Sequence, residues 1–374
     1  MQRTPQLSTL SLLLTGLFAA TSTQAATPQN IPDSKGITVQ ATSEQVNTVE
    51  VTAEHLKSAR VDLSPKVGTT VYSIDKHMVD MFGQGDSTPF NEVLLRLPGV
   101  AQDSKASGNL HVRDDHGDVQ YRVNGVQLPE GISGFGQSID TRLIDQTDFV
   151  TGALPAQYGL RTAGIVDIQT KEGHTRPGGR IGILVGNHHY FMPSAEFFGT
   201  VGAFNYYLSG SYLSNNLGIE NPTAGRDAIH DKTVQNKSFG NMSYYLDDST
   251  RLGMMFGTYH GKFQIPNNPG QTAGFSLTGV SDATTGASTL PSSQLNENQN
   301  EINRFVVVSY QKNLGDLNYQ FSAFHQYSEL HFQPDAIGDL VYNGVVSDTL
   351  RSNSASGVQA DLSYKLNQTH TLRT

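Results

Sequence analysis

The sequence predicts an α+β domain in residues 67–175, followed by the antiparallel strands of a membrane β-barrel in residues 176–374. The first observation is a change of pattern, because helix and hairpin signals give way near residue 178 to alternating apolar and polar residues. The second is that the later connections alternate between short and long. The third is composition: 37% of residues are hydrophobic, 16% are charged and 37 are glycine, which suits a large β-structure with one face in water.

Charge and cysteine content exclude several classes. The formal net charge of −9 argues against general nucleic-acid affinity, so we expect no nucleic-acid partner. The chain has no Cys, which excludes disulfides, thiol nucleophiles and a lipid-modified N-terminal Cys.

The N-terminus has the pattern of a secretory signal peptide over residues 1–25. Arg3 precedes a short apolar run at residues 10–20, and Thr23-Gln24-Ala25 supplies a small-x-small end. The apolar run is well short of the ~20 residues that a membrane-spanning helix needs. We therefore expect export from the cytoplasm.

Residues 26–66 are predicted to be a flexible linker that contains one extended segment. Residues 26–46 are rich in Thr, Gln, Pro and Ser. In the segment that follows, Val49 and Val51 alternate with Glu50 and Thr52, up to Ala53, which favours an extended backbone. Such a segment can add as a strand to a partner sheet, although an ordinary strand or linker has the same pattern.

A short helix is predicted near residue 89. Thr88 is a candidate N-cap and Pro89 suits the first helical position. One apolar face follows at positions i, i+3, i+4 and i+7, and Pro98-Gly99 ends the helix. The face consists of Phe90, Val93, Leu94 and Leu97.

Strands and tight turns complete the α+β domain. Residues 67–74, 111–114, 119–123 and 126–128 have strand character, and Asn124-Gly125 is a strong signal for a tight hairpin. A further strand begins at Phe149-Val150, is interrupted by Gly152, Pro155 and Gly159, and resumes at residues 165–168.

Alternation and turn length define the barrel strands. We expect strands near 179–187, 194–202, 205–214, 235–246, 250–262, 301–313, 317–331, 351–366 and 370–374. Residues 215–234, 263–300 and 332–350 are long loops, whereas the other connections are short. Short periplasmic turns and long external loops are typical of outer-membrane barrels, and the alternative is a soluble β-sandwich.

Several of these segments resemble the plug domain of TonB-dependent outer-membrane receptors. They are L-L-R-L-P-G-V at 94–100, V-N-G-V at 123–126, T-G-A-L-P-A-Q-Y-G at 151–159 and A-G-I-V-D-I-Q-T-K at 163–171. Ala163 and Asp167 stand where the family more often has Gly and Asn. The residues that carry the resemblance are Pro98, Gly99, Asn124, Gly125, Gly152, Pro155, Tyr158, Gly159, Thr170 and Lys171.

The resemblance implies a receptor in the outer membrane of a Gram-negative bacterium, with a periplasmic N-terminus and lipid around the barrel. It makes residues 67–175 a plug and Val49–Ala53 a TonB box, gripped by the energy transducer TonB. The nutrient, a ferric siderophore, cobalamin or carbohydrate, would bind between the outer loops and a plug apex at 127–137 and 153–161. The barrel is incomplete, with about nine strands where plugged transporters have about 22.

No catalytic motif is present, so we expect neither an enzyme nor a cofactor. His188-His189 suggests an exposed hairpin turn and not a metal site, because neighbouring strand residues point to opposite faces. Loop 263–300 has only Asp282 and Glu297 as charges, which favours a neutral, hydrogen-bonding ligand. The alternatives are a signal-transducing receptor, for which residues 26–46 are too short to form the extra domain, and an adhesin or passive pore.

Overall fold

The computed structural model describes the chain except for residues 1–41, 62–68, 103–109, 114, 117–118, 130–137, 155, 160–162, 174–175 and 218–228. The predicted signal peptide and the first part of the predicted linker lie outside the described residues. Ala41–Thr374 form one compact unit. Within its described part, no helix combines the length and the apolar character needed to cross a membrane.

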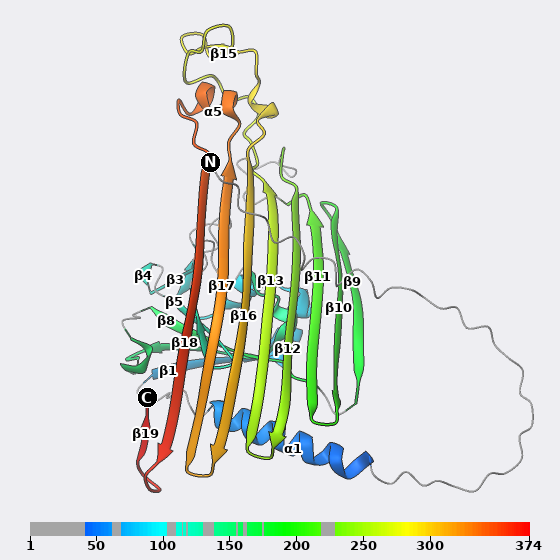
Figure 1. The fold of residues 1–374 in the computed structure, drawn as a ribbon. Coiled ribbons are helices and arrows are strands. Elements are labelled where there is room, and N and C mark those ends of the chain that lie inside the picture. The colour runs from blue at the N-terminus through cyan, green and yellow to red at the C-terminus, as the bar shows by residue number, and fades with distance from the viewer. Residues whose placement is uncertain are drawn as a thin grey trace, which may run out of the picture. The chain divides into compact units, whose positions relative to one another are not determined.

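A nine-stranded antiparallel sheet, which we call the wall, occupies the C-terminal half of the chain (Figure 1). Each strand pairs with the next wall strand along the chain. All nine predicted strands are confirmed with small shifts at their ends; the largest is that β10 begins at Tyr190. The strands are β9 (Gly178–Gly186), β10 (Tyr190–Val201), β11 (Phe204–Asn215), β12 (Thr233–Asp247), β13 (Thr250–Gln264), β16 (Asn298–Leu314), β17 (Leu317–Gln333), β18 (Thr349–Lys365) and β19 (Thr371–Arg373).

The two faces of the wall differ as a membrane barrel requires. On β9, Ile181, Ile183 and Val185 are 74%, 67% and 68% exposed. The opposite face carries buried polar side chains, such as Asn241, Glu301 and Gln320. A soluble sandwich would bury the apolar face between sheets, so this arrangement contradicts that alternative.

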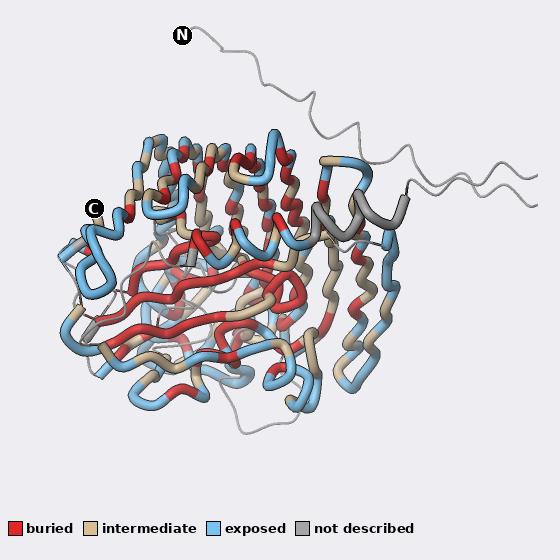
Figure 2. Tube along the Cα trace, turned by 90° about the horizontal axis from the view of Figure 1, so that it is seen from below, coloured by how far each residue is buried: buried red, intermediate tan, exposed pale blue. Residues whose placement is uncertain are grey.

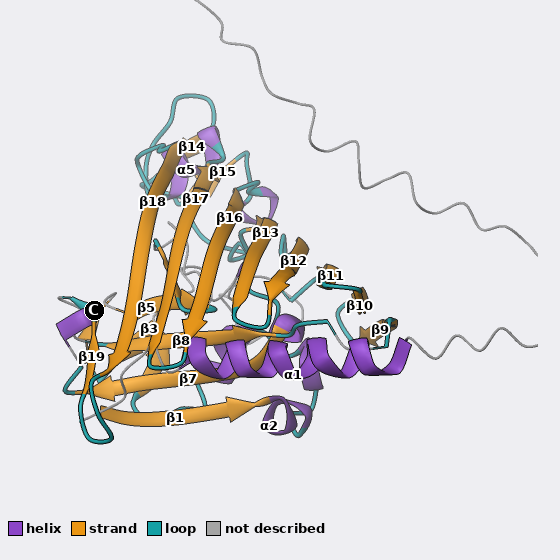
Figure 3. Ribbon diagram, turned by 60° about the horizontal axis from the view of Figure 1, so that its bottom comes forward, coloured by secondary structure: helices purple, strands orange, loops and turns teal. Residues whose placement is uncertain are grey.

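The plug domain is built on a five-stranded sheet in the order β1-β7-β8-β5-β6. Its strands run across the direction of the wall strands (Figure 3), and all except the edge strand β1 are buried along most of their length (Figure 2). The central strand is the most deeply buried, with Ile165, Val166 and Ile168 fully covered. The strands are β1 (Thr69–Asp75), β5 (Val119–Val123), β6 (Val126–Leu128), β7 (Ile144–Gly152) and β8 (Gly164–Thr170).

Short elements surround this sheet. They are α2 (Lys76–Asp80), η1 (Gly85–Ser87), α3 (Phe90–Leu94), β2 (Val100–Gln102), β3 (Leu110–Val112), β4 (Asp115–His116), η2 (Thr141–Leu143) and η3 (Ala156–Tyr158). The predicted apolar helix face is confirmed, since Phe90, Val93 and Leu94 join the main hydrophobic core.

The predicted N-cap of that helix is wrong. Pro89 occupies the N-cap position, with ψ of 136°, and it makes no side-chain cap hydrogen bond. The helix therefore starts at Phe90, one residue later than expected, and Thr88 lies outside it. The backbone carbonyl of Thr88 instead accepts a hydrogen bond from Thr141 Oγ1 at 2.5 Å.

The segment Val49–Ala53 lies in helix α1 (Thr42–Val61), so the predicted extended conformation is wrong, as is a flexible linker over residues 42–61. The alternation is short, and the residues after it have helical spacing. Thr52, Leu56, Ala59 and Arg60 fall on one face and are buried, whereas Val51 is 70% exposed. The helix contacts β16 and β17 (Figure 3), and this packing outweighs the β preference of two valines.

The two long loops after β13 and β17 pack together beyond the strands. They contain β14 (Ser281–Asp282), β15 (Ala287–Ser288), η4 (Ser292–Gln294) and α5 (Ala336–Tyr342). Ala273 and Leu295 of the first loop share a small hydrophobic core with Val341 and Tyr342 of the second. These loops lie at the end of the wall opposite the short turns β10–β11, β12–β13, β16–β17 and β18–β19 (Figure 1).

Candidate functional site: the interface between plug and wall

Two of the predicted plug motifs meet each other and the wall. Asn124, in the hairpin turn, donates from Nδ2 to Thr170 Oγ1 at 2.9 Å and accepts at Oδ1 from Thr170 N at 3.0 Å. Asn241 of β12 donates to the same Thr170 Oγ1 at 3.0 Å. All three residues are buried. The hairpin, the last plug strand and the wall therefore share one hydrogen-bond network.

Lys171, the next motif residue, is bound to a buried carboxylate of the wall. Its Nζ lies 3.3 Å from Glu196 Oε2 on β10, and Tyr207 of β11 donates to the same oxygen at 2.9 Å. Arg180 Nε approaches the other carboxylate oxygen at 3.3 Å. Burial lowers the pKa of Lys171, although Glu196 opposes this shift.

Glu172 joins three parts of the molecule. Its Oε1 lies 3.2 Å from Arg60 of α1 and 3.2 Å from Arg251 of β13. Burial alone would raise the pKa of Glu172, but Arg251 and Arg60 outweigh it and lower the pKa. Burial, aided by Arg251, lowers the pKa of Arg60. We call Lys171, Glu172 and their ionic partners Arg60, Arg180, Glu196 and Arg251 the charged contact.

The tip of the β5–β6 hairpin meets β17 and β18 through amide side chains. Gln359 donates to Gly125 O at 2.8 Å and accepts from Gln127 N at 2.9 Å, while Gln320 Nε2 approaches Asn124 O at 3.4 Å. One ion pair is adjacent, with Arg122 Nη2 3.4 Å from Asp361 Oδ1. We call this set of residues the hairpin contact.

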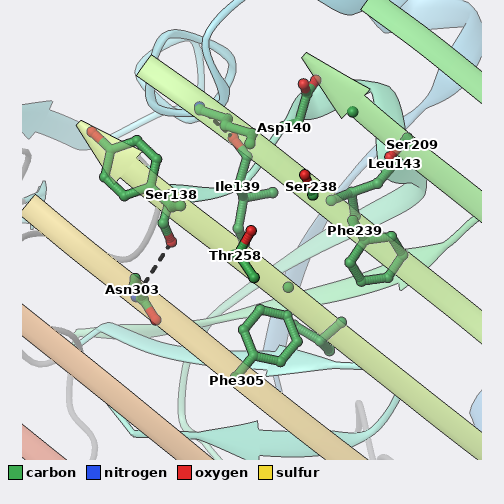
Figure 4. Close-up of a pocket in the computed structure, with 15 residues that line it drawn as sticks. Ser138, Ile139, Asp140, Leu143, Ser209, Ser238, Phe239, Thr258, Asn303 and Phe305 are labelled. Carbon is green, nitrogen blue, oxygen red and sulfur yellow. Dashed lines mark hydrogen bonds between the residues drawn. The ribbon is translucent and has the colours of Figure 1, made fainter. Parts of the chain in front are cut away.

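Between these two contacts, the plug segment 138–143 seals closely against the wall (Figure 4). Asn303 donates to Ser138 Oγ at 3.4 Å, and Lys237 Nζ donates to Ile139 O at 3.1 Å. The remaining space is about 20 Å³, bordered by Thr258 and Phe305 among others. That is room for about one water molecule, so this region is a seal and not a ligand site.

The other plug-motif residues shape turns. Gly99, Gly125, Gly152 and Gly159 have φ of +76°, +80°, +95° and +69°, a backbone region that favours glycine. Gly99 O accepts from Arg113 N at 2.8 Å in the turn after Pro98. Tyr158 packs with Val150 and Ile165, with the Arg122 guanidinium 5.6 Å from its ring centroid. Pro155 lies outside the described residues, as do 130–137 and 160–161 of the predicted apex.

No cluster of His, Cys, Asp or Glu in the described part of the chain has the arrangement of a metal site. His188 and His189 form the turn between β9 and β10, where both have positive φ. The interface thus offers hydrogen bonds and ion pairs that hold a plug against a wall.

Sequence reasoning missed the wall partners of the motifs, which are Glu196, Asn241, Arg251, Gln320 and Gln359. Their only signal is a charged or amide residue on the inward-facing side of a strand. The partners also lie far along the chain, since 234 residues separate Gly125 from Gln359.

Solved structures with this architecture include FpvA of Pseudomonas aeruginosa bound to a ferric pyoverdine, with a TM-score of 0.60, 12% identity, and 82% of this chain and 41% of that one covered. The FrpB iron transporter of Neisseria meningitidis has a TM-score of 0.59 and 14% identity, with 82% of this chain and 48% of that one covered. The siderophore receptor PirA of Acinetobacter baumannii has a TM-score of 0.57 and 12% identity, with 82% of this chain and 46% of that one covered.

The chain has the fold of TonB-dependent receptors. It spans less than half the length of the three receptors named, so its barrel is partial. The predicted fold class, a plug followed by an incomplete antiparallel barrel, is confirmed. The sequence itself matches neither a protein-family model nor a curated protein.

Proposed function

We propose that the protein takes part in TonB-dependent uptake of a scarce nutrient through the outer membrane of a Gram-negative bacterium. The observation that carries the proposal is the position of α1. This helix contains Val49–Ala53 and is bonded both to the plug and to the wall. A pull on its N-terminal part would therefore reach the plug through the rest of the helix.

The contacts of α1 support this coupling. Thr52 Oγ1 lies 3.3 Å from Asp248 Oδ1 in the short β12–β13 turn, which is consistent with α1 on the periplasmic side. Lys57 Nζ lies 2.5 Å from Asp145 of the plug, and Arg60 pairs with Glu172. Gln311 of β16 donates to Leu56 O at 2.7 Å.

In this proposal, TonB grips Val49–Ala53, and the exposed apolar face of the wall contacts lipid. Strand addition to TonB requires an extended segment, so the first turns of α1 must unwind before TonB binds. The nutrient is a ferric siderophore, cobalamin or a carbohydrate, bound between outer loops and plug.

Replacing Val51 by Pro tests the assignment, because Pro removes an N–H that strand addition requires. In cells that express the protein from its natural gene, we expect nutrient uptake to fall at least about tenfold, while nutrient binding stays near normal. Uptake is measured with labelled ferric chelates, cobalamin and oligosaccharides, with and without TonB.

His55→Pro is the matched control, because it breaks the same helix two residues beyond the proposed TonB box. Cells with this variant should take up more nutrient than cells with Val51→Pro. Full uptake by Val51→Pro, or uptake that does not depend on TonB, would contradict the proposal.

A further inference from the structure

Two cations lie on the outer side of the wall, away from the plug. Lys262 of β13 and Arg304 of β16 are exposed, and neither forms an ion pair or a side-chain hydrogen bond with any residue that the structure describes. Both belong to the face that carries the exposed apolar residues. Lys262 is in phase with Leu252 and Met254, and Arg304 is in phase with Val308, since side chains an even number of residues apart share a face.

The two cations come from strands that lie side by side and pair directly (Figure 1). Lys262 lies opposite Asn300, and Arg304 lies opposite Thr258, so the two positions are four residues apart along the register. At ~3.4 Å per residue this separates the two backbones by about 14 Å, which the flexible stems of Lys and Arg span from both sides. The half-buried His260 lies between them on the same face. Both cations can therefore contact one shared group.

The cations lie where the apolar part of this face ends. Each is ten residues from an exposed leucine near the short turn of its own strand, Lys262 from Leu252 and Arg304 from Leu314. In a barrel strand tilted by about 35–45°, ten residues cover about 24–28 Å along the membrane normal, which matches an apolar band about 25 Å tall. With the short turns on the periplasmic side, as proposed, the two cations lie at the level of the outer lipid head groups.

The cation at the opposite end of this face has partners within the protein. Lys312 of β16 is in phase with Arg304 but lies near the short turns. Its Nζ lies 3.5 Å from Asp247 Oδ2 and donates to Thr250 Oγ1 at 2.6 Å. The wall thus neutralises the cation at its short-turn end and leaves the two cations at the other end open to an anion from outside the protein.

The outer face of the wall therefore changes character in three steps toward the long loops. Exposed apolar side chains come first and the two cations second. Neutral amides come third: Asn300 Nδ2 donates to Gln333 Oε1 at 2.9 Å. The carboxylate of Glu329, on the same face of β17, accepts a hydrogen bond from Tyr327 and forms no ion pair with Arg304. Acyl chains, a phosphate and a sugar suit these three steps in this order.

We propose that Lys262 and Arg304 bind the phosphate of an acylated sugar phosphate, a glycolipid in the outer leaflet, on the outside of the barrel. The phosphate accepts charge-assisted hydrogen bonds from Lys262 Nζ and from the Arg304 guanidinium. The acyl chains lie on the apolar face below, and the sugar meets the amides above. This inference rests on the proposed outer-membrane location, but it does not require nutrient uptake.

The test titrates the purified, detergent-solubilised protein with diphosphoryl lipid A and counts bound lipids by native mass spectrometry. We expect the dissociation constant to rise about fivefold in Lys262→Gln and in Arg304→Gln, and about 25-fold in the double variant, because each substitution removes one cation beside a phosphate. Added salt should weaken binding to the wild type more than binding to the double variant, since the site is exposed.

Lys312→Gln is the matched control, because it removes a cation from the same face of the same strand at the other end, and it should leave lipid binding unchanged. Arg304→Lys keeps the charge and should retain most of the affinity that Arg304→Gln loses. Both cations are exposed, so their substitution should leave the strand content intact, which circular dichroism checks.

Dephosphorylated lipid A, phosphatidylglycerol and inorganic phosphate serve as the comparison ligands, and each should bind more weakly than lipid A. Equal binding of lipid A with and without its phosphates would overturn the proposal, as would an equal loss in Lys312→Gln. Equal binding of phosphatidylglycerol or inorganic phosphate would overturn the assignment to a glycolipid.

The outcomes for the lipid site and for uptake are separate. Phosphate-dependent binding of lipid A to a protein whose uptake does not depend on TonB would count against the uptake function alone. TonB-dependent uptake by a protein that binds lipid A without regard to its phosphates would count against the lipid site alone.

Discussion

The charged contact and the hairpin contact hold the same plug against the same wall with different chemistry. In the charged contact, two carboxylates, Glu172 and Glu196, are each shared by two cations; Arg60, Glu196 and Arg251 are buried, whereas Arg180 is exposed. In the hairpin contact, a single ion pair, Arg122 with Asp361, lies beside Gln320 and Gln359, which bond mainly to backbone groups, and Gln359 is half-buried. A buried ion cluster tolerates little displacement, because a separated charge stays desolvated. A half-buried amide can exchange its partner for water at little cost.

The two contacts therefore differ in how firmly they hold the plug. The charged contact fixes the end of the plug, α1 and strands β10 and β13 in one geometry. We therefore expect the plug to separate more readily at the hairpin contact, on β17 and β18. Two measurements test this difference and a third tests the outer loops, beginning with the largest expected effect.

Glu172→Gln should destabilise the docking of α1 and plug by about 3–5 kcal/mol, because it leaves Arg60 and Arg251 buried without a carboxylate. The chain has no Cys, so a fluorescent label at Ser58→Cys on α1 reports undocking during a denaturant titration. In the wild type, the folded-state pKa of Glu172 is lowered, so its contribution is complete above its ordinary pKa of 4.5 and is lost as pH falls through the lower value.

Asp145→Asn is the control for this measurement, because it removes an ion pair to α1 whose carboxylate is 39% exposed. Its effect should stay below about 1 kcal/mol. Equal effects of the two substitutions would show that burial does not distinguish the charged contact.

Gln359→Ala should cost about 1–2 kcal/mol, because it removes two neutral hydrogen bonds to the hairpin, which water can replace, and one to Asp361 of the same strand. A label at Gln127→Cys, near the hairpin tip, follows the separation of hairpin and wall. Ser352→Ala, on an exposed position of the same strand, should have no effect. A loss as large as that of Glu172→Gln would invalidate the comparison.

The outer loops should respond to pH in the opposite direction. Burial, the hydrogen bond to Asp339, and the charges of Asp339 and Asp335 raise the pKa of Glu297 to about 7. A raised carboxyl pKa gives stability that is complete below 4.5 and is lost as pH rises through about 7. Hydrogen exchange of residues 273–297, corrected for intrinsic rates, should therefore become faster over this range.

Glu297→Gln should remove that pH dependence, whereas Asp282→Asn, in the same loop, should preserve it. The effect is the smallest of the three, because Glu297 is only partly buried. Exchange that slows with rising pH would contradict the assigned carboxyl pair.

The sequence predicted those features that depend on neighbouring residues. Alternation located all nine wall strands, and Asn124-Gly125 located the hairpin, whose turn residues have φ of +50° and +80°. The sequence-based predictions were wrong where packing between distant segments determines the local structure. Val49–Ala53 is helical because Leu56 and Arg60 dock on the wall and plug, and Thr88 is displaced from its predicted capping role by the extended Pro89. No local pattern predicts which residue Lys171 or Gly125 contacts, because Glu196 and Gln359 lie on wall strands.

Helix α1 is much shorter than the same residues would be in an extended conformation. Its 20 residues span about 30 Å as a helix, and about 66 Å if fully extended. A partner that pulls its N-terminal end would gain about 36 Å of slack before the chain becomes taut at residue 61. The helix therefore sets the distance over which a partner must pull. A shorter displacement only unwinds the helix, and only a displacement of more than about 36 Å transmits full tension to the plug.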